Sequence, residues 1–101
     1  MKISFQVATP DVDTPLLPSA QGALSDNLRV LTRFGYEGVE ISLRQPREID
    51  FDSLGKEVRE HGLEISAIHT AAIGFQDRIW LCHPDESIRR EAMDRLKGAL
   101  D

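Results

Sequence analysis

The side chain best placed for chemistry in this sequence is His69, which directly follows the apolar-rich segment 63–68. An imidazole at the end of such a segment can ligate a metal ion or form a hydrogen bond to a hydroxyl group of a bound molecule. It can also be held by the backbone of its own loop. We expect His69 to contact a bound molecule rather than a metal ion, and the backbone-bound ring is the alternative.

Two charged residues near the middle of the chain could contact the same molecule. Glu40 has the opposite parity to the apolar residues of segment 38–43, so its carboxylate points away from them. This carboxylate could accept hydrogen bonds from hydroxyl groups, or it could pair with Lys2. Arg44 shares the face of Glu40 and could bind an anionic group, although an arginine solvated in a loop is the simpler interpretation.

Trp80 and Gln6 complete the set of candidate contacts. Trp80 could form an apolar wall against a ring-shaped molecule, whereas covering a core is the commoner role for a loop tryptophan. Gln6 lies on the polar face of the first alternating segment and is the weakest candidate. The adjacent residues Cys82 and His83 do not indicate a metal site, because neighbours in sequence rarely converge on one ion without further ligands.

Length and composition exclude several classes of protein. The chain has 101 residues, the size of one small domain. Its 12 basic and 17 acidic residues give a formal charge of −5, which argues against binding to nucleic acid. It has a single cysteine and no apolar run of the roughly 20 residues that would span a bilayer. We expect a cytoplasmic protein whose partner is a small polar molecule, and a homo-oligomer is compatible with these features.

Strand and helix periods alternate three times along the chain, and these elements must position the candidate residues. The expected elements, with approximate bounds, are strand 2–8, helix 24–34, strand 38–43, helix 51–61, strand 63–69 and helix 85–100. The connecting stretches 9–22 and 70–83 are expected to be long loops. Two internal similarities, offset by 24 and by 27 residues, disagree about which residues of segment 63–69 point inward. The inward-facing set of that strand therefore stays open.

This order of elements predicts an α/β protein with a parallel sheet. Helices on one side would leave the other sheet face bare, and that face would carry Lys2, Ser4, Gln6, Glu40 and Ser42. Such side chains suit the mouth of a closed barrel better than a dry core. The last helix also lacks a stop signal before its end. We therefore expect residues 1–101 to form three βα units of a barrel that continues beyond them.

Four stretches of the sequence are similar to one enzyme family. The stretch 34–41, FGYEGVEI, resembles the helix-to-strand junction of the sugar phosphate isomerase/epimerase family, within the xylose isomerase-like TIM barrel superfamily. Segments 61–67, 83–85 and 89–92 fit the same pattern at the expected distances. The resemblance implies a complete (β/α)8 TIM barrel of roughly 250 residues, of which residues 1–101 are the N-terminal three βα units. It also implies a divalent metal ion, Mn2+, Mg2+ or Zn2+, whose ligands lie beyond Asp101.

The resemblance further implies a metal-dependent isomerisation or epimerisation of a sugar or sugar phosphate, by proton transfer next to a carbonyl. Residues 1–101 alone should be inactive, because the metal ligands and the proton-transfer glutamates are missing from them. A dehydratase acting on a polyol or a shikimate-type acid is the alternative within the superfamily. An apurinic endonuclease, a branch in which a histidine at the position of His69 binds metal, is disfavoured by the charge of −5. Outside enzymes, the alternative is a non-catalytic βα module that associates with a second copy.

Overall fold

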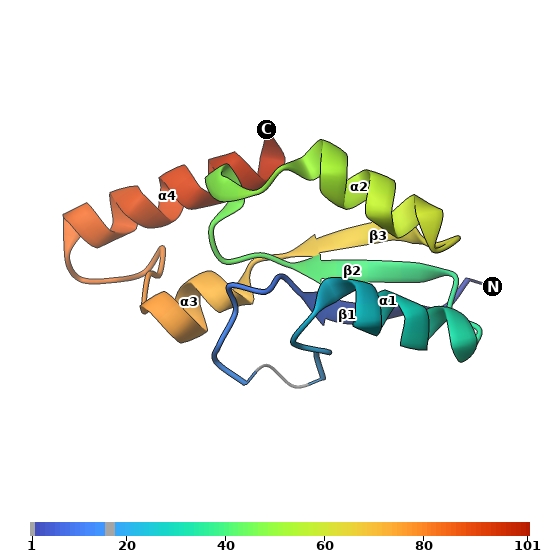
Figure 1. The fold of residues 1–101 in the computed structure, drawn as a ribbon. Helices are drawn as coiled ribbons and strands as arrows, with labels where there is room; N and C mark the ends of the chain where they lie inside the picture. The colour runs from blue at the N-terminus through green and yellow to red at the C-terminus, as the bar shows by residue number, and fades with distance from the viewer. Residues whose placement is uncertain (1, 16–17) are drawn as a thin grey trace.

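In the computed structural model, which describes residues 2–15 and 18–101, three parallel strands form one open sheet (Figure 1). The strands lie in the order β1 (Ser4–Ala8), β2 (Gly38–Ser42) and β3 (Glu64–His69). The helices are α1 (Leu24–Arg33), α2 (Phe51–Glu60), α3 (Ala71–Asp77) and α4 (Glu86–Leu100), with a 3-10 turn, η1, at Pro46–Glu48. Parallel strands that alternate with helices confirm the predicted α/β fold and its βα units.

The hydrophobic core lies between one face of the sheet and the helices α1 and α2. Alternation along β1 and β2 places Val7, Val39 and Ile41 on this face, and all three are fully buried. They form one cluster with Leu28, Leu31, Leu43, Leu54, Val58 and Leu63. Each fully buried side chain of this size contributes about 1.5–3 kcal/mol through its removal from water. This layer therefore holds the strands and the two helices together.

Local sequence explains where α2 and α4 begin. Asp50 precedes α2, and its carboxylate accepts hydrogen bonds from the Ser53 hydroxyl at 2.7 Å and from the Ser53 backbone N–H at 3.1 Å. These hydrogen bonds hold the pKa of Asp50 below its ordinary value. Asp85 caps α4 in the same way, where it accepts from the N–H of Ser87 at 2.8 Å. Both caps pair N–H groups that the first helical turn leaves without an intrahelical partner.

A bulge in β3 decides which of its residues point away from the helices. On the two sides of the bulge, Val39 pairs with Ile65 and Glu40 pairs with Ala67. Ser66 is therefore the extra residue, and its hydroxyl donates a hydrogen bond to the backbone carbonyl of Val39 at 3.1 Å. Beyond the bulge, His69 pairs with Ser42 and shares its face of the sheet. The bulge explains why two offsets in the sequence disagreed about the inward-facing set.

Helix α3 lies inside the stretch 70–83 that the sequence predicts to be a loop, so that prediction is wrong. The helix has only seven residues, contains Gly74, and has no side-chain hydrogen bond from Thr70 at its start. It ends at Arg78 in the left-handed region, with φ of 58°. Packing stabilises it instead: Ala72 lies in a buried cluster with Ala8 and Val12, and Ile73 lies with Ile79 and Ala92. Tertiary contacts therefore override weak local propensity here.

The two edges of the sheet differ. The outer edge of β1 is paired with Ala20, which accepts from the N–H of Ala8 at 2.8 Å and donates to the carbonyl of Gln6 at 2.9 Å. Within the described residues, β3 is an edge strand with no strand paired to its outer side. All of its residues before His69 are exposed. Met1 of the predicted barrel segment and Leu16 and Leu17 of the predicted loop 9–22 lie outside the described residues. Within the described part of the chain, no helix is long and apolar enough to cross a membrane.

Candidate functional site

Three polar side chains from neighbouring strands meet at the carboxyl end of the sheet. Gln6 of β1, Ser42 of β2 and His69 of β3 lie on the face opposite to the layer of α1 and α2. Gln6 Nε2 and Ser42 Oγ each lie 3.3 Å from His69 Nδ1. Parallel strands end at the same edge of a sheet, so residues 63 and 27 positions apart in the chain become neighbours. Two of the five predicted site residues, Gln6 and His69, are thus brought together.

The contacts of His69 Nδ1 determine what the other ring nitrogen can do. An amide nitrogen only donates hydrogen bonds, so Gln6 Nε2 donates and Nδ1 accepts. A neutral imidazole whose Nδ1 accepts carries its proton on Nε2. His69 can therefore donate from Nε2 to an oxygen of a bound molecule. It cannot ligate a metal ion through Nε2 in this form, because a ligating nitrogen needs a free lone pair.

Glu40 lies on the same face, next to the three-residue cluster. The strand register places it beside Gln6 on β1 and Ala67 on β3. Its expected structural partner, Lys2, is paired elsewhere, because Lys2 Nζ lies 2.7 Å from a carboxylate oxygen of Glu64. No side chain within residues 2–15 and 18–101 donates a hydrogen bond to Glu40. Its half-buried carboxylate is therefore available as an acceptor for hydroxyl groups.

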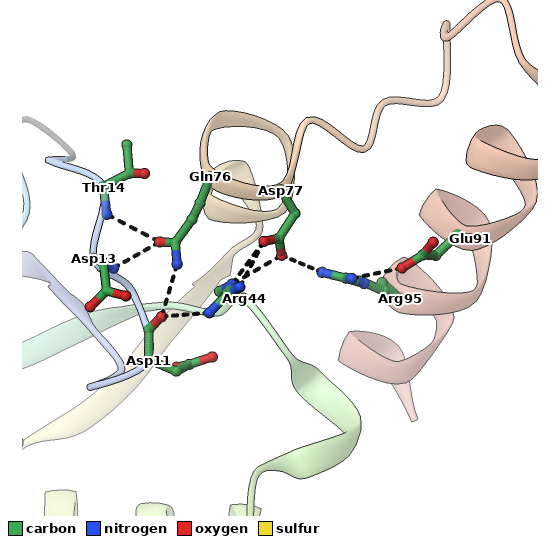
Figure 2. A network of polar contacts seen from close by, with 8 residues as sticks. All are labelled: Asp11, Asp13, Thr14, Arg44, Gln76, Asp77, Glu91 and Arg95. Carbon is green, nitrogen blue, oxygen red and sulfur yellow. Dashed lines mark hydrogen bonds and ion pairs between the residues drawn. The ribbon is translucent and has the colours of Figure 1, made fainter.

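Arg44 follows β2 and is held by a partner from another element (Figure 2). Its Nε lies 3.0 Å from each carboxylate oxygen of Asp77, and Nη2 donates to Asp77 Oδ1 at 2.8 Å. Its Nη1 donates to the backbone carbonyl of Asp11 at 3.2 Å. The side chain is only 28% exposed, so the interpretation of Arg44 as a solvated loop residue is wrong. Its contact with a bound molecule stays a prediction.

A second arginine binds the same carboxylate. Arg95 of α4 donates from Nη1 to Asp77 and from Nη2 to Glu91 at 2.7 Å. Asp77 and Arg95 are 13% and 14% exposed, so these charges are largely removed from water. The hydrogen bonds from Arg44, and then the one from Arg95, hold the pKa of Asp77 below its ordinary value. The four alternating charges join the end of β2 to α3 and α4 (Figure 2).

Trp80 packs on α3 and is not part of the His69 cluster. Its ring makes an edge-to-face contact with Phe75, with ring centroids 5.6 Å apart and planes at 87°. It covers Gly74, where a Cβ atom would overlap the indole ring. It also lines an apolar cavity of about 330 Å³ between α3 and α4, which neither Gln6 nor His69 lines. These surroundings suit a covering role, and the predicted wall against a bound ring stays a prediction.

The described residues do not form a metal centre by themselves. No group of three or more His, Cys, Asp or Glu side chains within residues 2–15 and 18–101 could hold a metal ion. His69 and Glu40 by themselves would supply too few ligands. The ligands of the predicted divalent ion are expected beyond Asp101, so the ion stays a prediction.

Three residues of this region, Ser42, Gln76 and Asp77, are not among the site residues predicted from the sequence. Ser42 has the same parity as Glu40, so the alternation along β2 was a sufficient signal to include it. Gln76 and Asp77 carried no such signal, because they lie on the helix that was predicted to be a loop. Their importance depends on contacts with residues 33 to 65 positions earlier in the chain.

A comparison with known protein families finds a match over most of the chain. A family model described as xylose isomerase-like TIM barrel matches residues 28–101, from α1 to the last residue. A comparison with curated proteins gives no significant match. The family match agrees with the parallel βα units and with polar side chains gathered at the carboxyl ends of the strands.

Proposed function

This chain belongs to the xylose isomerase-like TIM barrel family, and from that premise we propose that it is the N-terminal part of a metal-dependent sugar or sugar-phosphate isomerase or epimerase. The superfamily includes isomerases and epimerases. Active sites of (β/α)8 barrels lie at the carboxyl ends of the strands. In this chain that edge is where Gln6, Ser42 and His69 meet.

The observation that carries the proposal is the set of hydrogen-bonding groups on the barrel-facing side of the sheet. His69 can donate from Nε2, and the carboxylate of Glu40 can accept. A sugar or polyol has adjacent hydroxyl groups, each of which donates one hydrogen bond and can accept up to two. One donor and one acceptor on neighbouring strands can therefore fix the orientation of such a molecule. Gln6 and Ser42 hold the His69 ring in the orientation that this contact needs.

Isomerisation and epimerisation of a sugar both move a proton at a carbon next to a carbonyl. A bound divalent ion would polarise the oxygens of the substrate in such a reaction. We propose that the ligands of this ion and the proton-transfer groups come from residues beyond Asp101. The residues of this chain bind and orient the substrate and shape the wall of its site.

Replacing His69 by alanine in the complete protein should raise KM for the substrate about tenfold and change kcat less. The reason is the loss of one hydrogen bond to a hydroxyl, which is worth about 1–1.5 kcal/mol. The measurement is steady-state turnover of five- and six-carbon ketoses, D-xylulose and D-fructose first, with Mn2+ or Mg2+ added. His61→Ala is the matched control, since His61 hydrogen-bonds to the carbonyl of Glu57 at the end of α2.

Three results would change the proposal. A complete protein that binds no divalent metal and turns over no ketose would rule out the isomerase or epimerase. If the protein removes water from a polyol acid to form an unsaturated product, the dehydratase would replace the isomerase or epimerase as its function. Unchanged kinetics in His69→Ala beside normal turnover would remove His69 from the substrate site.

A further inference from the structure

A single side chain of α3 holds the segment that follows β1. Gln76 Oε1 accepts hydrogen bonds from the backbone N–H groups of Asp13, at 2.7 Å, and Thr14, at 3.1 Å (Figure 2). Gln76 Nε2 donates to the backbone carbonyl of Asp11 at 3.2 Å. All three hydrogen bonds are made to main-chain groups. We call the segment 11–14 the mouth segment.

The mouth segment is also tied to β2 and packed on α3. The carbonyl of Asp11 that accepts from Gln76 also accepts from Nη1 of Arg44 at 3.2 Å. Val12 in the middle of the segment is only 4% exposed and contacts Ala72. The segments that follow β1, β2 and β3 therefore form one connected unit at the carboxyl edge of the sheet.

A short series of contacts connects this unit to His69. The Thr9 hydroxyl lies 2.6 Å from Oδ1 of Asp11, and the Thr9 N–H donates to the carbonyl of Ser42 at 3.0 Å. The hydroxyl of Ser42 lies 3.3 Å from His69 Nδ1. His69 itself is two residues before α3. The mouth segment thus lies on the rim of the site that contains His69.

We propose that Gln76 is a positioning residue that holds the mouth segment as one wall of the substrate site, an inference that rests on the proposed function. Gln76 makes hydrogen bonds to two consecutive N–H groups and one carbonyl of a loop. If its side chain is removed, water takes its place as the partner of these backbone groups. The backbone around Asp13 and Thr14 then moves more freely beside α3. Arg44 still donates to the carbonyl of Asp11, and Gln21 still donates to the carbonyls of Val12 and Thr14. A substrate bound beside His69 loses the wall that limits its position, so binding weakens more than the chemical step does.

The test uses the complete protein and the substitution Gln76→Met, which keeps the length of the side chain and removes all three hydrogen bonds. Gln45→Met is the matched control, because it makes the same chemical change at the start of η1. Gln76→Glu is the conservative variant: it keeps an acceptor for the two N–H groups and loses the donor to Asp11. The two readouts are amide hydrogen exchange of residues 11–14 and the KM and kcat for D-xylulose and D-fructose.

We expect Gln76→Met to speed exchange of the Asp13 and Thr14 amides about tenfold or more, while the amides of β1 keep their protection. KM should rise about tenfold and kcat should stay within about twofold. Gln76→Glu should lie between the native protein and Gln76→Met in both readouts, and Gln45→Met should match the native protein. A merely structural role would instead lower the protection of the whole sheet and leave KM unchanged.

The other outcomes separate this inference from the proposed function. Unchanged exchange at Asp13 and Thr14 in Gln76→Met overturns the holding role. Faster exchange with an unchanged KM overturns the placement of the mouth segment in the substrate site. If the native protein turns over no ketose, the proposed function fails, and the exchange data alone decide whether Gln76 holds the segment.

Discussion

Replacing Asp77 by alanine should lower the free energy of unfolding by about 3 kcal/mol. The substitution leaves the guanidinium groups of Arg44 and Arg95 without their shared carboxylate, in a place where little water reaches them. Removal of one partner from a buried ion pair costs about 3–5 kcal/mol, because the remaining charge is uncompensated. The lower end applies here, since Arg44 is 28% exposed. Urea denaturation followed by circular dichroism gives the value.

Asp94→Ala is the matched control for this change. Its carboxylate pairs with Arg47 at 2.8 Å, but the two side chains are 62% and 54% exposed. Pairs between exposed side chains contribute little to stability, so this variant should unfold at nearly the native urea concentration. Equal losses in the two variants would show that the Asp77 network is no stronger than a surface pair.

The same carboxylate should make stability depend on pH. The hydrogen bonds from Arg44 lower the pKa of Asp77 in the folded protein, so the folded state favours the charged form. Its contribution is complete above the unfolded pKa of about 3.9 and is lost as the pH falls through the lower, folded pKa. Asp77→Asn should therefore flatten the loss of stability on the acid side of pH 4. An identical acid profile in the variant would contradict the pairing.

Replacing Gly74 by alanine should destabilise the protein by about 2 kcal/mol, although alanine is the better helix former. A Cβ atom at Gly74 would overlap Cζ3, Cη2 and Cε3 of Trp80. The indole must then leave α3, and its contact with Phe75 is lost. The gain of about 1 kcal/mol from helix propensity is smaller than the cost of such overpacking. Urea denaturation, with Trp80 fluorescence as the probe of the indole position, checks this result.

Gly55→Ala in α2 is the matched control, and it should have the opposite sign. The nearest atom to a Cβ there is Nη1 of Arg59 at 3.1 Å, the end of a flexible side chain that can move aside. This variant should gain up to about 1 kcal/mol. In a Trp80→Ala background, Gly74→Ala should lose most of its cost. A persistent cost in that background would place the strain in the helix backbone instead of the indole contact.

The spacing of hydrophobic residues and the helix-capping residues in the sequence predict much of this structure. Alternation in segments 2–8 and 38–43 predicts β1 and β2 and puts Gln6 and Glu40 on one face, as the pairing of these two residues shows. Helical spacing predicts α1, α2 and α4, and Asp50 caps α2. These signals are local, because backbone geometry repeats every two residues in a strand and every 3.6 in a helix. The family resemblance agrees with the match over residues 28–101.

Only the tertiary structure decided the rest of the site. The extra residue Ser66 changes the parity of β3 and turns His69 toward Ser42, and no local pattern marks a bulge of one residue. Helix α3 forms because buried neighbours hold it, with little help from its own propensity. Asp77 meets Arg44 and Arg95 across 33 and 18 positions of sequence. Such contacts exist only after the strands have aligned their carboxyl ends, which is why their partners could not be read from the chain alone.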